Sequence, residues 1–328
     1  MSTLRLSLAC GPYDRTDALR SSLVHPEGID LVYVPIQSPP ELFARMLTTQ
    51  AYDASEMSCA HDLIHRGRGD YPFVAIPVFP SRMFRHGYIF VNAEAGIEGP
   101  QDLAGKRVGV PEYSQTAAVW IRGLLQDEYD VRPESIRWYA GGVNAPGGRP
   151  DVLFNPPPAS ISITRIADRT LNDMLVDGAL DALIGARKPA ALGRDPRVRR
   201  LFPNYRELER DYYRDTGIFP IMHTVVIRES LYREQPWVAD SLFKAFVQAK
   251  EWCLAQMRFS SSLRYTLPWL HAELEEMGEL FGADPWPYGL APNRKTLETL
   301  VRYLVEQGFL RDPPPLEDLF APITVLSE

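Results

Sequence analysis

Hydrophobic positions in the first third of the chain recur first with the spacing of a strand and then with that of a helix. Leu4, Leu6 and Leu8 alternate with polar residues, which predicts a strand over Leu4–Cys10. A run rich in β-branched residues at 29–36 predicts a second strand, and Pro39–Thr49 predicts a helix with proline in its first turn. Further elements are expected at 14–23 (a helix) and at 54–59, 73–78 and 88–92 (strands). This alternation favours an α/β fold with a parallel sheet covered on both faces.

The segment 99–125 predicts a strand, a polar loop and an amphipathic helix, in that order. The strand is expected at Arg107–Val110, and the helix is marked by apolar residues at helical spacing: Ala117, Trp120, Ile121, Leu124 and Leu125. The residues at the helix start are Tyr113, Ser114, Gln115 and Thr116. Because unpaired N–H groups and a positive dipole end attract anions there, we expect these residues to bind a small carboxylate. The alternative is that Ser114 or Thr116 only caps the helix.

A second α/β unit is expected to start near residue 93. Its predicted strands lie at 135–139, 159–166 and 179–184, and a Gly/Pro/Asn-rich loop at 141–158 is long enough to suggest a functional role. Another strand is expected at 219–227. The last hundred residues are mostly helical, with apolar stripes at 238–253 and 297–305 that indicate core packing.

Composition narrows the classes of partner. The 328 residues suit two domains, and 45% hydrophobic and 23% charged residues are ordinary for a globular protein. The net charge of −7 argues against nucleic acid as the main partner, although local charge can still bind a small anion. The three cysteines are too far apart in sequence for a disulfide framework or a zinc pattern.

The first residues contain a possible targeting signal. Leu8-Ala9-Cys10 faintly resembles a lipoprotein cleavage site, but the apolar stretch before it is too short and Arg5 interrupts it. No run approaches the roughly 20 apolar residues of a membrane span. We therefore expect a cytoplasmic protein with no membrane partner, and a homo-oligomer is possible.

Several segments of the sequence resemble one known protein family. The element order and PQDLAGKRVGVP before a helix are similar to the type II periplasmic binding protein-like superfamily. Within it, four segments resemble the 4,5-dihydroxyphthalate decarboxylase family: YDASEMSC (52–59), FPSRMFRHGYIFVN (79–92), GIFPIMHTVVIR (217–228) and DPWPYGLAPNRKTLETLVRYLVEQGFL (284–310). The resemblance implies two lobes joined by two crossover strands, at 88–92 and 222–227, with a ligand cleft between the lobes. Lobe one is then expected at 1–91 and 224–328, and lobe two at 92–223.

The same resemblance implies the cofactor-independent decarboxylation of a dihydroxylated aromatic dicarboxylate to protocatechuate. The alternative is a solute-binding protein that captures a small carboxylate without catalysis, since the fold is shared. A third hypothesis is another small-acid enzyme on the same scaffold. The absence of a recognisable export signal and the Arg/His set at 82–86 favour an enzyme.

Such a reaction needs an anion clamp, a proton donor near the ring carbon and an acceptor for a phenolic proton. Arg82 and Arg85 are expected to hold carboxylates, and His86 titrates near neutral pH and could move a proton. The alternative for all three is a basic turn in water.

The second candidate for proton transfer is His223, in an apolar predicted strand, where a satisfied core histidine is the alternative. Glu56 and Ser58 lie near the end of a predicted strand, where open α/β sheets place ligands. Glu56 is expected to accept the phenolic proton and Ser58 to bind substrate, the alternative for Glu56 being a solvated or paired carboxylate.

Two more arginines are candidate substrate ligands, and one histidine pair is a weak metal candidate. Arg165 and Arg187 could each reach a cleft from lobe two, or could lie on the plain surface. His61 and His65 are one helical turn apart, but two imidazoles without a third ligand do not predict a metal site. We therefore expect no metal.

Overall fold

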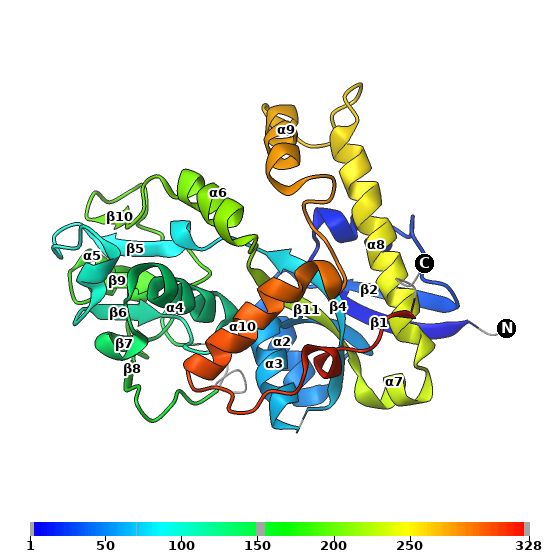
Figure 1. Ribbon diagram of the computed structural model, residues 1–328, viewed down its shortest axis with the longest axis horizontal. Coiled ribbons are helices and arrows are strands. Elements are labelled where there is room, and N and C mark those ends of the chain that lie inside the picture. The colour runs from blue at the N-terminus through cyan, green and yellow to red at the C-terminus, as the bar shows by residue number, and fades with distance from the viewer. Residues whose placement is uncertain (1–2, 70, 149–154, 325–328) are drawn as a thin grey trace.

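Two β-sheets, one in each of two lobes, organise the computed structural model, which describes residues 3–69, 71–148 and 155–324 (Figure 1). The first sheet has the order β2-β1-β3-β11-β4, from strands β1 (Leu4–Cys10), β2 (Ile29–Pro35), β3 (Ala54–Ser58), β4 (Phe73–Arg82) and β11 (Ile221–Arg228). The second has the order β10-β5-β9-β6-β7-β8, from β5 (Ile89–Asn92), β6 (Arg107–Val110), β7 (Arg137–Ala140), β8 (Ile163–Arg165), β9 (Ala182–Ile184) and β10 (Val198–Arg200).

Helices cover both sheets. Those between the strands of the first lobe are α1 (Asp17–Arg20), α2 (Pro39–Thr49) and α3 (Cys59–Arg68), and those of the second lobe are α4 (Thr116–Tyr129), α5 (Leu171–Val176) and α6 (Tyr205–Thr216). The C-terminal part adds α7 (Glu229–Glu234), α8 (Trp237–Arg258), α9 (Leu270–Phe281) and α10 (Arg294–Glu306). The helix expected at 14–23 is shorter, a 3₁₀ turn at Asp14–Thr16 followed by α1.

Strand pairing follows the hydrophobic pattern. β1 pairs in parallel with β2 and β3, and every residue of β3 is buried, as is typical of a strand covered on both faces. β11 is antiparallel to both β3 and β4 and lies between them. The carboxyl end of β3 therefore meets the start of β11 at one edge of the sheet.

The chain passes from the first sheet to the second after Arg82 and returns before Ile221. β5 lies wholly in the second sheet and β11 wholly in the first. The expected lobe limits at 91/92 and 223/224 thus fall inside these two strands. The chain exchanges sheets in the segments 83–88 and 201–220, and neither β5 nor β11 pairs in both sheets.

Helix α10 follows the C-terminal helices of the first lobe and packs on α4 of the second (Figure 1). The Tyr303 hydroxyl donates to Asp127 at 2.7 Å, and Trp120 Nε1 donates to the carbonyl of Ile221 at 2.9 Å. Gly123 permits this packing, because a Cβ there would lie 2.3 Å from the Tyr303 ring. These contacts hold the lobes at a defined separation.

No described helix combines the length and the apolar character needed to span a membrane.

Candidate functional site

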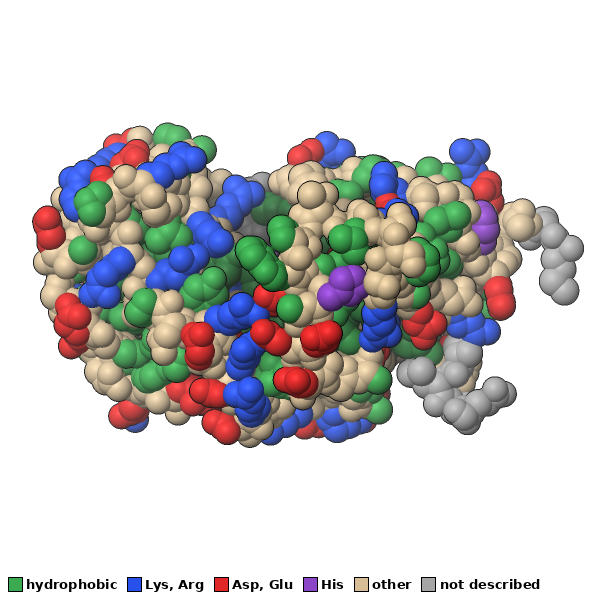
Figure 2. Space-filling model, turned by 90° about the horizontal axis from the view of Figure 1, so that it is seen from above, with side chains coloured by type: hydrophobic (Ala, Val, Ile, Leu, Met, Phe, Trp, Pro, Cys, Tyr) green, Lys and Arg blue, Asp and Glu red, His purple; other side chains and the backbone are tan. Residues whose placement is uncertain are grey.

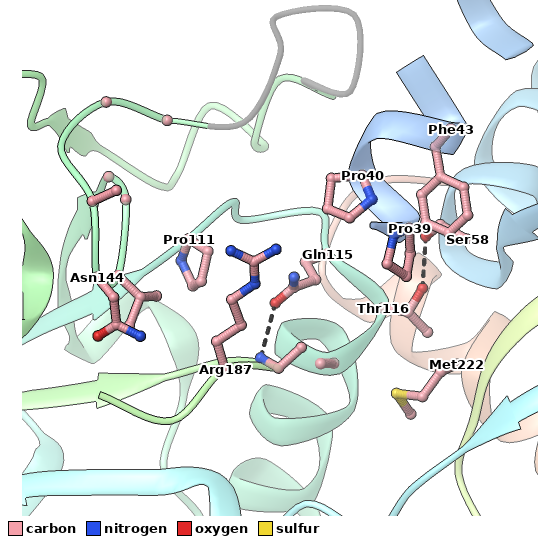
Figure 3. A pocket seen from close by; sticks show the side chains of 18 of the residues that line it. Pro39, Pro40, Phe43, Ser58, Pro111, Gln115, Thr116, Asn144, Arg187 and Met222 are labelled. Atoms are coloured by element: carbon pink, nitrogen blue, oxygen red, sulfur yellow. Dashed lines mark hydrogen bonds between the residues drawn. The ribbon is translucent and has the colours of Figure 1, made fainter. Parts of the chain in front are cut away.

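A cavity of about 500 Å³ lies between the two lobes (Figure 3). The first lobe and the segment after β4 contribute Pro39, Pro40, Phe43, Ser58, Arg85, Met222 and His223. The second lobe contributes Pro111, Gln115, Thr116, Ala117, the loop 141–148, Ala186 and Arg187. Figure 2 shows the molecule hollowed between its lobes, with basic side chains gathered beside the hollow. The wall combines apolar surface with few polar groups, as is typical of a small-molecule site.

Two helices, one from each lobe, begin at this cavity. Ser58 precedes α3 and Thr116 begins α4, and their hydroxyl oxygens are 2.8 Å apart. The Thr116 hydroxyl also accepts from the Ala60 N–H at 3.1 Å. The Thr116 hydroxyl of α4 therefore caps the start of α3, in the other lobe. At the start of α4 itself, the N-cap residue Gln115 makes no side-chain capping bond among the described residues. Both starts direct N–H groups and a positive dipole end to the cavity, which favours an anion.

Arg85 supplies a buried positive charge to the cavity wall. Its side chain is 5% exposed, Nε donates to the Met222 sulfur at 3.2 Å, and Nη1 has no hydrogen-bond partner among the described residues. Burial lowers the pKa of Arg85 to about 10, which leaves it charged at neutral pH. The charge of Glu209 offsets part of this effect on the pKa, and the guanidinium lies 5.1 Å from the Tyr88 ring centroid. The cavity wall thus carries a buried cation, a group suited to an anion.

Arg187 supplies a second, exposed guanidinium from the opposite wall (Figure 3). It follows Gly185, where glycine is required because φ is 143° and an added Cβ would lie 2.8 Å from the Pro111 ring. The Gln115 side chain accepts from the Ala186 N–H at 3.2 Å and so fixes the backbone beside Arg187. Among the described lining residues, the cavity thus has one buried and one solvent-accessible arginine.

The His223 imidazole is held by a buried carboxylate. Its Nδ1 lies 2.5 Å from Oε1 of Glu56, which is fully buried. Glu56 also accepts from the Tyr13 hydroxyl at 2.6 Å and from the Gly11 N–H at 2.9 Å. Burial alone would raise the pKa of Glu56, but the His223 charge and these hydrogen bonds hold it below its ordinary value. Glu56 is therefore ionised at neutral pH, and Nε2 is the imidazole nitrogen left for the cavity.

Irregular strand pairing aims His223 at the cavity. Its register against β4 shifts on both sides, between Ile221 and His223 and again between His223 and Val225. The facing segment of β4 contains Pro77 and Pro80, which cannot donate to a ladder hydrogen bond. Such irregularities re-aim side chains and are common beside active sites.

Arg82 does not line this cavity. β4 continues through it, and the buried guanidinium donates to the carbonyls of Phe219 at 3.2 Å and Pro287 at 2.6 Å and to the Asn293 side chain. Of the two arginines expected to hold carboxylates, only Arg85 lines the cavity, and Arg82 instead ties β4 to the segment before α10. The sequence interpretation ended the strand at residue 78 and placed Arg82 in the connection before the next strand, which left its burial by the segment before α10 unforeseen.

The remaining predicted residues lie away from the cavity wall. His86 is enclosed by the Phe202 and Tyr212 rings, and burial lowers its pKa to about 4, so it is neutral and does not fit the expected proton donor. Tyr113 is buried under the Arg122 guanidinium, 3.7 Å from its ring centroid, and Ser114 donates to Glu112. Arg165 is exposed on β8.

Sequence reasoning missed two parts of the site. Tyr13 was not singled out, although it follows β1 at the carboxyl edge of the sheet, the position that marks ligand sites in open α/β folds. The glycine-rich loop 141–148 was noted for its length, but its residues were not assigned to the site.

Phe43 of the cavity wall contacts the His223 ring edge-on, with ring centroids 5.1 Å apart.

Across residues 3–69, 71–148 and 155–324, no group of three or more His, Cys, Asp and Glu side chains could hold a metal ion. His61 instead lies 2.9 Å from the Asn155 amide nitrogen.

Comparison with curated proteins identifies the family. No protein-family model matches the chain. A 4,5-dihydroxyphthalate decarboxylase of Comamonas testosteroni is 36% identical over 328 residues, which cover 100% of this chain and 99% of the relative. The chain belongs to the 4,5-dihydroxyphthalate decarboxylase family. A member from Pseudomonas putida is 36% identical over 215 residues, 65% of this chain and 83% of the relative.

Solved structures confirm the fold expected for this family member. A periplasmic sulfonate-binding protein of Methylobacillus flagellatus KT aligns over 98% of this chain and 92% of its own, with a TM-score of 0.53 and 14% identity. The desulfurization enzyme DSZB, solved as a mutant with biphenyl-2-sulfinic acid, aligns over 97% and 96% with a TM-score of 0.50 and 17% identity. A binding protein and an enzyme thus share this fold, so the chemistry must be argued from the cavity.

Proposed function

We propose that the protein decarboxylates a dihydroxylated aromatic dicarboxylate of the 4,5-dihydroxyphthalate type to protocatechuate. Membership of the decarboxylase family supports the reaction type. The observation that carries the proposal is that a buried guanidinium, with one nitrogen that makes no hydrogen bond to the described residues, and a carboxylate-held imidazole line one cavity. The first group suits a carboxylate, and the second suits a proton transfer.

In this proposal the two substrate carboxylates bind the two cations. Arg85 holds one in the buried end of the cavity, and Arg187 holds the other near solvent. The helix starts at Ser58 and Thr116 add N–H donors, and Gln115 fixes the backbone beside Arg187. Phe43 and the prolines provide flat apolar surface for the ring.

His223 acts as the proton donor. Nε2 gives its proton to the ring carbon that bears the departing carboxylate, while the para hydroxyl loses a proton to water and its electrons stabilise the protonated ring. The bond from the ring to the carboxylate then breaks, carbon dioxide leaves, and the ring recovers its aromaticity and its phenolic proton. The net change consumes one proton per carbon dioxide released, and Glu56 keeps the imidazole oriented and stabilises its charged form.

Glu56 takes a different role from the one the sequence suggested. Both of its oxygens are occupied by protein donors, and it does not line the cavity, so it does not meet a phenolic proton. Capture of a carboxylate without chemistry would need the cations alone, so the Glu56–His223 pair favours catalysis over solute binding. The cytoplasmic location and the homo-oligomer stay predictions.

Incubation of the purified protein with 4,5-dihydroxyphthalate tests the proposal. We expect catalytic formation of protocatechuate, followed by chromatography, with one carbon dioxide per turnover. Phthalate is the matched control, because it has both carboxylates but no para hydroxyl; it should bind and not react. Stoichiometric binding of 4,5-dihydroxyphthalate with no turnover would favour the solute-binding alternative.

A further inference from the structure

Tyr13 shares an oxygen of Glu56 with the catalytic imidazole. The Tyr13 hydroxyl donates to Oε1 at 2.6 Å, and Nδ1 of His223 lies 2.5 Å from the same atom. We propose that Tyr13 is a positioning residue that sets the orientation and effective charge of Glu56, and through it the protonation of His223. The catalytic consequence rests on the proposed function, whereas the effect on His223 itself does not.

The surroundings hold the Tyr13 ring in one place. The Arg15 guanidinium lies 4.2 Å from the ring centroid and is itself fixed by Trp286, at 4.3 Å, and by the carbonyl of Pro80, at 2.6 Å. On the other side the ring passes so close to Gly11 that a Cβ there would lie 2.6 Å from it. Glycine at position 11 therefore permits the close approach of the Tyr13 ring, while the backbone N–H of the same residue donates to Glu56.

The hydroxyl can act only as a donor to Glu56. Burial, followed by the neighbouring charge of Glu56, raises the pKa of Tyr13 far above its ordinary value, so the phenol stays protonated. Glu56 is an ionised acceptor whose other oxygen, Oε2, receives the Gly11 N–H and the weak Cys10 thiol contact at 3.5 Å. Each donor spreads part of the carboxylate charge and leaves less of it to attract the imidazolium.

Removal of the hydroxyl should therefore have two effects. The carboxylate loses one charge-assisted hydrogen bond, so its attraction for the protonated imidazole increases. The carboxylate group also loses one of the contacts that fix its plane, so the imidazole is less well oriented toward the ring carbon.

The chain offers a matched control in the same cluster. Tyr13 and Glu56 are surrounded by four charged or titratable groups: Cys10 on β1, Arg15, Tyr33 on β2 and His223 on β11. The Tyr33 hydroxyl donates to the carbonyl of Gly11 at 2.7 Å and lies 3.0 Å from the Thr16 hydroxyl, and it does not bond Glu56. Tyr33→Phe thus removes a partly buried hydroxyl nearby that makes no hydrogen bond to the carboxylate itself.

The experiment compares wild type, Tyr13→Phe and Tyr33→Phe by NMR titration of ¹⁵N-histidine-labelled protein without substrate. We expect Tyr13→Phe to move the titration midpoint of the His223 ring nitrogens to higher pH by about one unit, the scale of one hydrogen bond to a charged group. Tyr33→Phe should leave it unchanged. In turnover assays, kcat of Tyr13→Phe should fall about tenfold with KM within twofold, and the basic limb of its pH profile should move in the same direction.

A second variant keeps the test decisive if Tyr13→Phe does not fold. Gly11→Ala retains the hydroxyl but displaces the Tyr13 ring, and it should raise the same midpoint. An unchanged midpoint in the folded variant, or equal shifts in Tyr13→Phe and Tyr33→Phe, would overturn the proposal. Because the titration needs no substrate, it gives its answer even if the protein proves not to be a decarboxylase.

Discussion

Nδ1 of His223 and Oε1 of Glu56 lie 2.5 Å apart, and their residues come from neighbouring antiparallel strands 167 positions apart in the chain. The pairing fixes which imidazole nitrogen faces the cavity and provides a negative charge behind it. In the proposed mechanism, this arrangement orients the partly buried imidazole for proton transfer at a defined position.

Glu56→Gln removes the charge but keeps the shape of the side chain. We expect kcat to fall by about 10²–10⁴-fold, since the amide no longer stabilises the imidazolium or enforces its orientation. KM should change little, because Glu56 does not line the cavity. Steady-state kinetics check this, and Asp62→Asn, which changes another buried carboxyl outside the cavity, serves as the control. Equal losses in both variants would point to a general loss of folding.

Arg82 and Arg85 are both buried and only three residues apart, yet their substitution should have different effects. Arg85→Gln removes the cavity cation and should weaken substrate binding by about 10–1000-fold, the range for losing a buried charge-assisted contact. Isothermal titration with phthalate measures this loss without turnover. The folded protein should keep its stability, since Nη1 of Arg85 has no protein partner among the described residues.

Arg82→Gln should instead destabilise the fold. It leaves two backbone carbonyls and the Asn293 side chain without their donor, which costs about 2–4 kcal/mol in the free energy of unfolding. Urea unfolding gives this number, and phthalate affinity should stay close to wild type. A large loss of phthalate affinity with unchanged stability would contradict this and would indicate that Arg82 binds the substrate.

The buried carboxyl of Asp62 predicts a dependence of stability on pH. Burial raises the pKa of Asp62 to about 7, despite the nearby Arg66 and Tyr71. The folded state therefore keeps a proton that the unfolded chain releases near pH 4, so the stabilisation is complete below that pH and is lost as the pH rises through about 7. Asp62→Asn should be more stable than wild type at pH 8, by at most about 4 kcal/mol at about 1.4 kcal/mol per pKa unit.

Urea unfolding of both proteins at pH 4 and pH 8 checks this. The two free energies of unfolding should converge at the lower pH. A constant difference between wild type and Asp62→Asn at both values would mean that Asp62 titrates normally in the folded protein.

Local patterns were enough to place most strands and the loop that begins α4. Alternation at Leu4–Cys10 and helical spacing after Thr116 depend on neighbouring residues, and the structure confirms both elements. The position of Gln115 and Thr116 in the cavity wall follows from the same local rule, since a helix start after a parallel strand lies at the ligand edge of a sheet.

The rest of the site depends on contacts between distant residues. Whether His86 or His223 faces the cavity is set by the prolines and the shifted register of β4 and β11, which a single sequence does not reveal. The same holds for the partner of Glu56 and for the burial of Arg82 by the segment before α10. Residue type suggested the candidate chemistry, and tertiary contacts decided which arginine and which histidine line the cavity.

The central claim is that Nε2 of His223 delivers the proton to the ring carbon, and His223→Asn tests it most directly. The asparagine amide can still donate to Glu56 in place of Nδ1 but offers no group at the position of Nε2. Turnover of 4,5-dihydroxyphthalate by this variant should fall at least about 10²-fold, while phthalate binding by isothermal titration stays within a few-fold of wild type. Wild-type turnover by a folded His223→Asn protein would contradict the account.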